Sequence, residues 1–551
     1  MKDGKTIKWI NTACGKAQRV KIGILIALNV LFSCATVFFA FAVKAVIDGA
    51  VKGNERLLVG GAIALGITVV LQFILRVLIN GLAEHLKARI DVNLKNRIFK
   101  KILVAKYPEI VKYHSGDLLN RLTSDVNVVS DGITSIVPSC TSAIARLILA
   151  VGALIYLDWV FAVAFVVAGL MVFTVITLMR ERLKKLHKSA QESEGEARSF
   201  MQENVENAMA VKAFSVNDEI MNKSQELHET NFKIKMKRRN YAVTGHALYN
   251  LIFSAGYLFA LVYGAIKLLQ GSLEYGTLTA ILQLVNNVQV PFASLSNVVP
   301  KYYATLSSAE RLIEIEGVEE ELSERIEDVD KTYAHLNSII FDGVNFSYGQ
   351  DEVLSAVNIK IDKGDFVAII GESGIGKTTL MKLLVAVYEP SKGRVLLSFD
   401  DGEQLVNERT RKLFAFVPQG NTLFSGTIRE NVTLLNRACT CAEIDDALKL
   451  CSCDFISELP KGIDTVIGER GLGLSEGQVQ RLALVRAILS KAPVLLLDEI
   501  TSALDENTER EILYNLSSLK GKTVIMITHK KAPVAFCKKT YDFADGQLKI
   551  R

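Results

Sequence analysis

Residues 366–385, FVAIIGESGIGKTTLMKLLV, read as a short β-branched strand, a glycine-rich loop and a helix. The loop fits the pattern G-x-x-x-x-G-K-[ST] with Gly371, Gly376, Lys377 and Thr378. Glycines let the backbone curl so that several N–H groups point at one phosphate, at the positive end of the following helix. Lys377 adds a charge for the β- and γ-phosphates, and the Thr378 hydroxyl is a ligand for Mg²⁺. The stretch therefore predicts an α/β domain that binds ATP or a related nucleotide.

A second buried strand carries acidic residues at its end. In APVLLLDEITSALD, residues 492–505, an apolar run is followed by Asp498 and Glu499. A carboxylate at a strand end beside a phosphate loop holds Mg²⁺, and the next one orients or deprotonates the attacking water. An isolated Asp-Glu pair is more often a solvated strand end, but the buried run before it and the separate phosphate loop favour the catalytic interpretation.

The residues before this domain have a different composition. The chain has 551 residues, which is too long for one domain, and 50% of them are hydrophobic. A net charge of +5 does not indicate nucleic-acid binding, for which a concentrated basic face is expected. Core helices of a large soluble protein do not account for so many long apolar runs. Six segments are long and apolar enough to cross a membrane: Ile22–Ile47, Leu57–Leu78, Val137–Leu157, Trp159–Met179, Ala247–Leu269 and Thr277–Val299.

Basic residues set the expected orientation of these segments. The connections after the second and fourth segments are long and rich in Lys and Arg: Lys87, Arg89, Lys95, Arg97, Lys100, Lys101, Arg180, Arg182, Lys184, Lys185, Lys188 and residues 233–239. By the positive-inside tendency, residues 1–20, both connections and the C-terminal domain are cytoplasmic. The eight cysteines form no disulfide framework, which agrees with a reduced compartment. Met1–Lys21 lacks a small-residue cleavage site, so we expect the first apolar segment to be retained.

Both long connections show helical patterning. Residues 84–107, EHLKARIDVNLKNRIFKKILVAKY, have apolar side chains at i, i+3 and i+4. Each connection is expected to form an antiparallel helix pair with about 25 residues per arm, which at 1.5 Å per residue reaches roughly 35 Å into the cytoplasm. A membrane protein that extends its spans this far is expected to hold something away from the bilayer.

A second glycine-rich turn runs into a helix at residues 471–484, GLGLSEGQVQRLAL. One phosphate loop at one helix start is sufficient to cradle the phosphates of one nucleotide. The second turn, residues 475–478 before a helix over Val479–Leu489, is redundant unless it faces another nucleotide.

These motifs resemble those of the ATP-binding cassette family, over nearly the whole length of the chain. In that family the signature, usually LSGGQ and here LSEGQ, closes over the ATP held by the other subunit, so that two chains sandwich two ATP molecules head to tail. The resemblance implies that a chain with one cassette pairs with another. Glu476 replaces a glycine of the signature, whereas Ser475 and Gly477, which face the γ-phosphate in the family, remain. The function is therefore expected to survive the replacement.

The resemblance also assigns individual roles. Tyr348 resembles the aromatic residue that stacks on adenine, Gln419 the glutamine that touches Mg²⁺ and senses the membrane domain, and His529 the switch histidine that contacts the γ-phosphate. TVIGERG, residues 465–471, matches the cross-talk loop of exporters, and SALD, residues 502–505, matches the loop that communicates across the dimer. The implied catalytic residues are Glu499, His529 and Gln419, and the implied Mg²⁺ ligands are Thr378, Gln419 and Asp498. The implied nucleotide contacts are Tyr348, Gly371, Ser373, Gly374, Gly376, Lys377, Thr378, Thr379, Ser475, Gly477, Gln478 and Asp505.

The membrane half resembles B-type exporters. Residues 115–129, SGDLLNRLTSDVNVV, and 203–214, ENVENAMAVKAF, resemble their two intracellular loops, which in the family end in coupling helices docked on the cassettes. Residues 307–315, SSAERLIEI, resemble the linker. The expected fold is a multidomain membrane protein. It has a six-helix transmembrane domain with long cytoplasmic helical extensions (21–305), a linker (306–336), and an α/β P-loop NTPase cassette with a helical subdomain (337–551).

The cysteines of the C-terminal domain form a weaker pattern. Cys439, Cys441, Cys451 and Cys453 are spaced as CxC…CxC, but the helical stretch between the pairs separates them by about 14 Å, whereas zinc lies about 2.3 Å from its thiolates. One shared zinc site is therefore not expected.

Polar residues interrupt the apolar segments. They either line a substrate path or bond neighbouring helices. The set comprises Gln72, Arg76 and Asn80 on one helix face, Arg146, and Gln283, Asn286, Asn287, Gln289 and Pro291 in the sixth segment. No acidic residue lies deep in any span, which favours an anionic, zwitterionic or amphipathic cargo over a cation.

The expected function is ATP-driven export across a bacterial plasma membrane, with ATP and Mg²⁺ as cofactors and a dimer of identical chains as the working unit. One alternative is a heterodimer with a related half-transporter. Another is an ATP-gated channel or regulatory subunit, against which the complete catalytic set argues. Peptide, lipid and drug exporters share these motifs, so the motifs do not identify the cargo.

Overall fold

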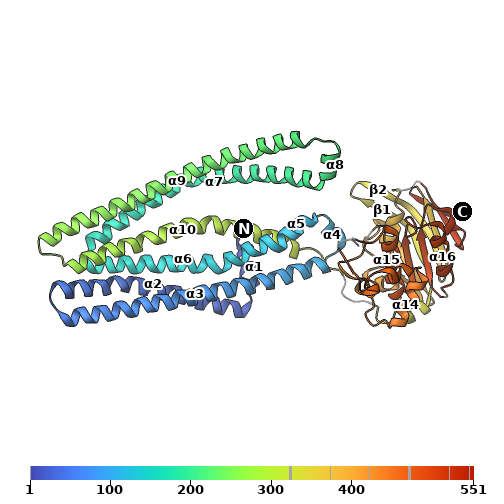
Figure 1. Cartoon of the computed structure of the whole chain (residues 1–551), viewed down its shortest axis with the longest axis horizontal. Coiled ribbons are helices and arrows are strands. Elements are labelled where there is room, and N and C mark those ends of the chain that lie inside the picture. Colours follow the sequence, from blue (N-terminus) through green and yellow to red (C-terminus); the bar gives the residue numbers. More distant parts are fainter. Residues whose placement is uncertain are drawn as a thin grey trace. The chain divides into compact units, whose positions relative to one another are not determined.

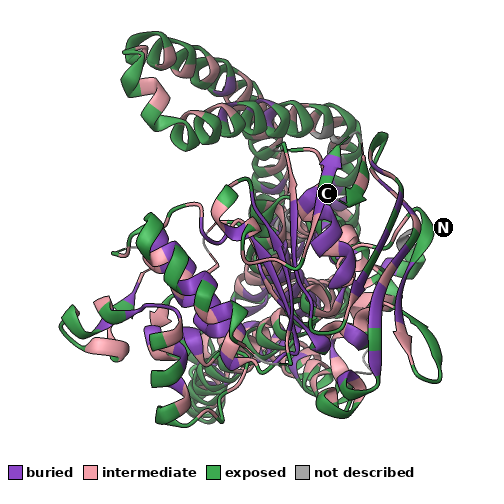
Figure 2. Cartoon of the chain, turned by 90° about the vertical axis from the view of Figure 1, so that its right-hand side faces the viewer, coloured by how far each residue is buried: buried purple, intermediate pink, exposed green. Residues whose placement is uncertain are grey.

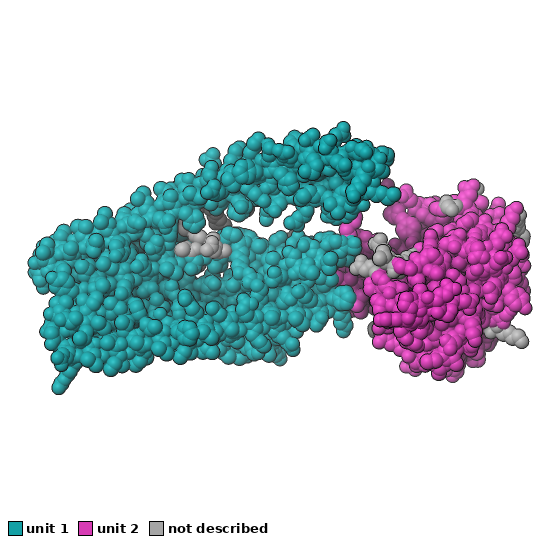
Figure 3. Space-filling view, in the orientation of Figure 1, with its two compact units in different colours: residues 1–100, 115–316 teal, residues 101–114, 317–551 magenta. Residues whose placement is uncertain are grey.

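The computed structural model describes residues 2–321, 326–372, 374–420, 422–468, 473–519, 521–544 and 546–550. The chain divides into two compact units, which Figure 3 colours separately. Unit 1 joins Met1–Lys100 to Ser115–Glu316, and unit 2 joins Lys101–His114 to Gly317–Arg551. The segment Lys101–His114 therefore belongs to the C-terminal unit, although it lies within the first long connection.

The described residues of unit 1 form helices joined by short turns, and the long helices α7 and α9 run side by side (Figure 1). Helix α3 continues past the unit boundary at Lys100. The helices are α1 (Lys2–Ala13), α2 (Gly15–Val51), α3 (Glu55–Val104), α5 (Ser115–Asn120), a π-helical turn (Arg121–Asp125), α6 (Val126–Leu157), α7 (Trp159–Glu206), α8 (Ala208–Ala213), α9 (Asn217–Leu269) and α10 (Tyr275–Glu316).

Among the described residues, five helices are long and apolar enough to cross a membrane: Gly15–Val51, Glu55–Val104, Ser115–Leu157, Trp159–Glu206 and Asn217–Leu269. Each contains one of the first five predicted segments. The sixth, Thr277–Val299, lies in α10, whose amide side chains make it less apolar than the other five. Helix α10 nevertheless packs into the core of unit 1, where Ile281 and Leu284 are buried together with Phe161, Phe165 and Phe253.

The predicted helical extensions are confirmed. Helix α3 has 50 residues, α7 has 48 and α9 has 53, so each continues well beyond the roughly 20 residues that a bilayer requires. The short helix α8 joins α7 to α9 within the second resemblance segment. Helix α10 likewise continues to Glu316, so residues 306–316 of the expected linker are helical.

A charged cluster ties the end of α2 to the turn before α10. The buried carboxylate of Asp48 accepts a hydrogen bond from the backbone N–H of Gly276 at 2.8 Å. Lys44 pairs with Asp48 at 3.1 Å and with Glu274 at 3.3 Å, and Lys52 also pairs with Glu274. A Cβ atom at Gly276 would lie 2.4 Å from the carbonyl oxygen of Lys44, so only glycine fits this approach.

A second cluster joins the π-helical turn to α10. Asp125 is 1% exposed, accepts a hydrogen bond from the Ser308 hydroxyl at 2.8 Å and pairs with Arg311. Arg121 donates to the carbonyl oxygen of Arg311 at 2.6 Å and pairs with Glu314 at 2.9 Å. Two of the sequence segments singled out above, residues 115–129 and 307–315, are therefore bonded to each other.

Unit 2 is built on two sheets. A six-stranded sheet has the order β12-β11-β3-β10-β9-β6, and a four-stranded antiparallel sheet has the order β2-β1-β4-β5. Strands β3, β9 and β10 run parallel, and β9 and β10 are buried at every position, as expected for strands covered on both faces. Figure 2 shows these buried strands in purple.

The remaining elements of unit 2 cover or extend these sheets. A short antiparallel contact pairs β7 with β8. The strands are β1 (Leu336–Tyr348), β2 (Asp351–Asp362), β3 (Phe366–Gly371), β4 (Lys392–Phe399), β5 (Gly402–Leu405), β6 (Phe414–Val417), β7 (Gly426–Thr427), β8 (Val466–Ile467), β9 (Val494–Asp498), β10 (Thr523–Ile527), β11 (Lys539–Ala544) and β12 (Gln547–Ile550). The α-helices are α4 (Tyr107–Val111), α11 (Val329–Ala334), α12 (Lys377–Leu384), α13 (Ile428–Val432), α14 (Cys441–Leu450), α15 (Glu476–Leu489), α16 (Glu506–Ser517) and α17 (Lys531–Val534).

The cysteines of the CxC…CxC pattern lie at opposite ends of α14. Cys451 and Cys453 are buried in the apolar core under α15, and Cys441 is exposed at the start of α14. Burial raises the pKa of Cys453 to about 12. All eight cysteines of the chain are free thiols.

Candidate nucleotide site and membrane cavity

The phosphate loop connects β3 to α12. Gly376 caps α12 with φ +112°, and a Cβ atom there would lie 2.4 Å from Cγ1 of Val353. Gly371, at φ +149°, leaves no room either, because its Cβ would lie 2.5 Å from the carbonyl oxygen of Phe543. Both positions therefore require glycine. Lys377 follows directly as the first residue of α12.

Lys377 is held inside this loop. Its ammonium group donates to the carbonyl oxygens of Gly371 at 2.8 Å and Glu372 at 2.6 Å. Burial lowers the pKa of Lys377, and the nearby carboxylates of Glu499 and Asp498 oppose that effect. Because both partners are neutral carbonyl oxygens, the positive charge of the buried ammonium is not neutralised by them and can attract a phosphate group.

The hydroxyl of Thr378 and the carboxylate of Asp498 meet at the start of α12. Thr378 Oγ1 donates to Asp498 Oδ2 at 2.7 Å, and Asp498 is 1% exposed. Burial raises the pKa of Asp498, which the Thr378 hydrogen bond partly offsets. Two hard oxygen ligands, one of them a desolvated carboxylate, fit the ligand preference of Mg²⁺. The donor set therefore fits the expected metal.

Glu499 stands next to Asp498 with a left-handed backbone conformation, φ +50°. Its carboxylate accepts a hydrogen bond from Gln419 Nε2 at 2.7 Å and lies 3.6 Å from Nδ1 of His529. The structure thus brings all three expected catalytic side chains together. A non-glycine residue in this conformation costs about 1–3 kcal/mol, a strain that is concentrated at functional sites.

Tyr348 ends β1 beside α12. Its hydroxyl lies 3.3 Å from that of Thr379, and its ring packs edge-on against Phe346 at 4.8 Å and against Tyr388 at 5.3 Å between centroids. The side chain remains 37% exposed. An aromatic ring with one supported edge and one accessible face suits stacking by a nucleotide base.

The second glycine-rich turn opens α15. The Ser475 hydroxyl accepts from the backbone N–H of Gln478, and the Gln478 side chain accepts from the N–H of Ser475, which forms a capping box. Gly477 is buried against the SALD loop, and a Cβ atom there would lie 2.8 Å from the carbonyl oxygen of Ala503. Asp505 caps α16 by accepting from the N–H of Thr508 at 3.0 Å.

Among the described residues, no bond joins the two glycine-rich turns to each other. In the parts of unit 2 that the structure describes, no hydrogen bond or ion pair links Ser475, Gly477, Gln478 or Asp505 to the phosphate loop. Ser373, and residues 469–472 at the end of the expected cross-talk loop, lie outside the described residues. Gly374, with φ +84°, has open space around its Cα.

Two contacts near the site join residues whose partners the sequence does not identify. Lys106 and Tyr107, at the start of α4, contact Glu389 and Tyr388, which follow α12. Arg411 forms a two-pronged ion pair with Glu321, at 2.7 and 3.0 Å. The paired residues are far apart in the chain. In the sequence, the first contact is indicated only by the aromatic and acidic residues Tyr388 and Glu389, which follow the phosphate-loop helix.

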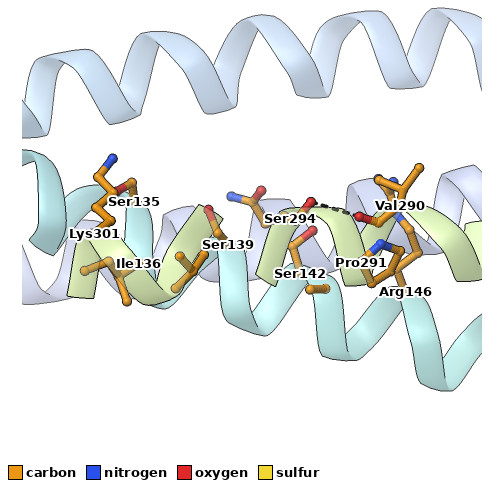
Figure 4. A pocket seen from close by; sticks show the side chains of 12 residues that line it. Ser135, Ile136, Ser139, Ser142, Arg146, Val290, Pro291, Ser294 and Lys301 are labelled. Atoms are coloured by element: carbon orange, nitrogen blue, oxygen red, sulfur yellow. Dashed lines mark hydrogen bonds between the residues drawn. The ribbon is translucent and has the colours of Figure 1, made fainter. Parts of the chain in front are cut away.

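A cavity of about 430 Å³ lies in unit 1 between α2, α6 and α10. Its lining combines hydroxyl groups with two cations (Figure 4). The residues are Asn29, Ser135, Ile136, Ser139, Ser142, Ala143, Arg146, Val290, Pro291, Ser294, Val298 and Lys301. Lys301 pairs with Asp131, which also pairs with Lys87 at 3.3 Å. The buried Nε of Arg146 has no hydrogen-bond partner among the described residues.

The predicted polar positions in the membrane helices take different roles. Arg146 lines the cavity, and Arg76 and Arg146 each approach the ring of Phe32 at 5.9 Å. Gln72 instead bonds a neighbouring helix, donating to the carbonyl oxygen of Ala35 at 3.2 Å. In α10, Pro291 lines the cavity.

Comparison with known proteins follows this division of the chain. Residues 22–292 match the family described as "ABC transporter transmembrane region", and residues 354–502 match the family described as "ABC transporter". The chain is 31% identical over 437 residues to an ATP-dependent lipid A-core flippase of Desulfotalea psychrophila, covering 79% of this chain and 76% of that protein. It is 26% identical over 550 residues to a putative multidrug export ATP-binding/permease protein of Staphylococcus aureus, covering 97% and 94%.

The fold has a close match among solved structures. A bacterial Atm1-family ABC exporter with ATP bound superposes with a TM-score of 0.81 at 23% identity, covering 96% of this chain and 94% of that one. That likeness agrees with a helical membrane region followed by an α/β cassette. The chain belongs to the ABC transporter family, as an ATP-hydrolysing exporter that carries the membrane region and one nucleotide-binding domain in a single polypeptide.

Proposed function

We propose that two copies of this chain export an anionic amphipathic molecule across the bilayer, driven by ATP hydrolysis at two sites shared between their cassettes. The main support for this proposal is the separation of the two glycine-rich turns among the described residues. The phosphate loop, with Lys377 and Thr378, forms one half of a nucleotide site, and the capping box at Ser475 forms another half that no contact joins to it among the described residues. Two chains placed head to tail complete both sites.

The residues of one site divide the work of hydrolysis. Lys377 neutralises charge on the β- and γ-phosphates, and Tyr348 stacks on the base. Thr378, Asp498 and Gln419 hold Mg²⁺, which when bound draws charge from the phosphate oxygens. Glu499 accepts a proton from the attacking water. Gln419 and His529 orient the Glu499 carboxylate, from which they lie at 2.7 and 3.6 Å. The partner's signature turn contributes the N–H groups and hydroxyl around Ser475 to the γ-phosphate.

The bilayer and the orientation follow from the helices. The apolar parts of α2, α3, α6, α7, α9 and α10 cross the membrane. The basic ends of the long helices favour a cytoplasmic position for the cassette and for the two segments that we call the first and second coupling turns, around α4 (Tyr107–Val111) and α8 (Ala208–Ala213). The bacterial relatives support a plasma membrane location.

The cavity in unit 1 supports the choice of cargo. Arg146 brings a guanidinium with an unpartnered Nε into a space lined by four serines, Ser135, Ser139, Ser142 and Ser294. Lys301 adds a second cation, although Asp131 partly neutralises it. A guanidinium recognises carboxylate or phosphate with paired hydrogen bonds, and the serines add donors. The name of one relative, a lipid A-core flippase, agrees with a lipid-like cargo.

Nucleotide binding tests the energy source. Lys377→Ala keeps the glycine turns but removes the charge, so affinity for ATP should fall strongly in titrations of the purified protein. Lys392→Ala, at the exposed start of β4, is the matched control. Unchanged affinity and unchanged hydrolysis in Lys377→Ala would contradict the phosphate-loop assignment.

Cargo is tested in nanodiscs that contain phosphatidylglycerol or phosphatidylcholine. The anionic lipid should stimulate ATP hydrolysis more than the zwitterionic one, and Arg146→Gln should remove that difference. Gln72→Leu, which changes a residue bonded to a neighbouring helix, should retain it. Equal stimulation by both lipids in the parent protein would exclude an anionic phospholipid as cargo.

A further inference from the structure

Three tyrosines lie in series in unit 2. Tyr388 packs edge-on against Tyr348 at 5.3 Å with an interplanar angle of 89°, and edge-on against Tyr107 at 5.7 Å with an angle of 87°. Tyr348 ends β1, Tyr388 follows α12, and Tyr107 begins α4. Tyr388 therefore lies between Tyr348, on which we place the nucleotide base, and Tyr107, which belongs to the first coupling turn.

The coupling turn is fixed beside Tyr388 by polar contacts. Lys106 pairs with Glu389 at 3.2 Å and with Glu319 at 3.0 Å. Its backbone N–H donates to the carbonyl oxygen of Glu319 at 2.9 Å, and the backbone N–H of Glu321 donates to the carbonyl oxygen of Val104 at 2.8 Å. These bonds hold the residue before Tyr107 against the cassette, so the Tyr107 ring has a defined position relative to Tyr388.

The segment that carries Tyr388 is attached to the phosphate loop as well. Helix α12 has eight residues, with Lys377 at its start, and Arg411 binds the carbonyl oxygens of Val385 and Ala386 just after its end. Helix α12 therefore connects Lys377 to the segment that carries Tyr388 without passing through Tyr348, whereas the contact between Tyr388 and Tyr348 connects it to the place of the base.

The two outer rings of the tyrosine series, Tyr348 and Tyr107, are partly exposed and can change orientation. Tyr348 is 37% exposed and Tyr107 is 45% exposed, so neither ring is locked in the core. The Lys382 ammonium lies 5.8 Å from the Tyr348 ring centre and 5.9 Å from that of Tyr388, where it interacts with both. Edge-to-face packing is directional, so turning or fixing one ring changes the preferred position of the next.

We propose that Tyr388 is a positioning residue that reports base stacking on Tyr348 to the coupling turn through Tyr107. The inference rests on the proposed nucleotide site. Its consequence is that the membrane region receives two separate signals, one from the phosphates through α12 and one from the base through the tyrosines. A triphosphate without a base delivers only the first signal.

Hydrogen exchange on the full chain tests this in the Glu499→Gln background, which keeps the bound compound intact. With Mg²⁺, ATP and inorganic tripolyphosphate are compared at concentrations that protect the phosphate-loop peptide equally. ATP should slow exchange across residues 105–113 severalfold more than tripolyphosphate does. Tyr388→Leu should abolish that difference, whereas Tyr388→Phe, which keeps the ring, should retain it.

The outcomes separate the inference from the nucleotide site itself. A purely structural Tyr388 would change exchange equally with both compounds and leave the difference between them intact, which would overturn the proposal. Equal protection by ATP and tripolyphosphate in the parent chain would also overturn it. If Tyr388→Leu does not fold, Tyr107→Leu removes the other end of the contact on an exposed side chain. If neither compound protects the phosphate loop, the proposed nucleotide site is wrong and the inference fails with it.

Discussion

The amide nitrogen of Gln419 donates to the carboxylate of Glu499 at 2.7 Å. The two residues come from different strands, since Gln419 follows β6 and Glu499 follows β9, and these strands are parallel neighbours in the six-stranded sheet. The carboxyl ends of adjacent parallel strands therefore place an amide beside the proposed base. The amide holds one carboxylate oxygen and leaves the other, which lies 3.6 Å from His529, for a water proton.

Glu499→Gln should bind ATP and hydrolyse it slowly. The amide has the same shape but accepts no proton as a base, so the rate should fall about 10²- to 10⁴-fold. Steady-state ATPase assays and nucleotide titration on the purified full chain measure both quantities. Glu372→Gln is the matched control, because Glu372 meets Lys377 through its backbone carbonyl. Wild-type turnover in Glu499→Gln would show that Glu499 is not the base.

Ser475→Arg should block cassette closure without emptying the nucleotide site. In the Glu499→Gln background, ATP and Mg²⁺ should hold two cassettes together, and a distance probe on each cassette reads this directly. The added arginine occupies the surface that we assign to the partner's ATP, while Lys377 and Tyr348 of the same chain remain unchanged. Full closure in the double variant would mean that the second glycine-rich turn does not serve the partner's nucleotide.

Gly477→Ala should reduce hydrolysis through the SALD loop. The new Cβ atom would lie 2.8 Å from the carbonyl oxygen of Ala503 and 3.2 Å from Cδ2 of Leu504. Overpacking of this kind costs about 1–3 kcal/mol. Placed wholly on the transition state, that cost lowers the rate about 5- to 150-fold. Glu476→Ala, an exposed neighbour on the same helix, should have little effect on ATPase activity. The idea fails if the two variants behave alike.

The cysteines near α14 should differ in reactivity. Cys441 is exposed, whereas Cys451 and Cys453 are buried and burial raises the pKa of both thiols, that of Cys453 to about 12. A thiol reacts as the thiolate, so maleimide at pH 7 should label Cys441 and spare the buried pair until the protein is unfolded. Peptide mass spectrometry locates the label. Rapid labelling of Cys453 in the folded protein would contradict its burial.

The cluster at Glu274 should make thermal stability depend on acid. Hydrogen bonds from the ammonium groups of Lys52 and Lys44 lower the pKa of Glu274 from 4.5 to about 2. Its contribution is therefore complete above pH 4.5 and is lost as the pH falls toward 2. Because the group is solvent-exposed, the effect is at most about 1 kcal/mol. The melting temperature of Glu274→Gln should lie below that of the parent at pH 7 and converge with it near pH 2. A constant gap across this range would exclude the carboxylate as the cause.

Much of the nucleotide site could be predicted because its residues stand in short contiguous motifs. Gly371, Lys377 and Thr378 follow one another in a single loop, and Asp498 and Glu499 end a single apolar strand. Parallel strands then bring the motifs together at one edge of the sheet, as the Thr378–Asp498 hydrogen bond of 2.7 Å illustrates. The membrane helices could be predicted for a different reason, because apolar runs of about 20 residues are rarely compatible with a water-exposed surface.

Contacts between distant segments could not be predicted in the same way. The pairing of Lys106 with Glu389 joins two residues whose neighbourhoods contain no recognisable pattern, and it depends on where α3 ends relative to the cassette. The sequence does not identify the role of Arg146, for a related reason. Apolar context alone does not show whether a guanidinium meets a partner or a cavity, and the cavity is formed by three helices that are separated in the chain.

The grouping of Lys101–His114 with Gly317–Arg551 has a consequence for how the protein is made. The ribosome completes the first coupling turn long before it begins the cassette that receives it. Lys106 and Tyr107 must therefore wait, without Glu389 and Tyr388, while the helices from α5 to α10 are synthesised. In a cassette produced alone as residues 317–551, Tyr388 and Glu389 would likewise lack Tyr107 and Lys106. Adding residues 101–114 as a separate peptide is the natural way to restore it.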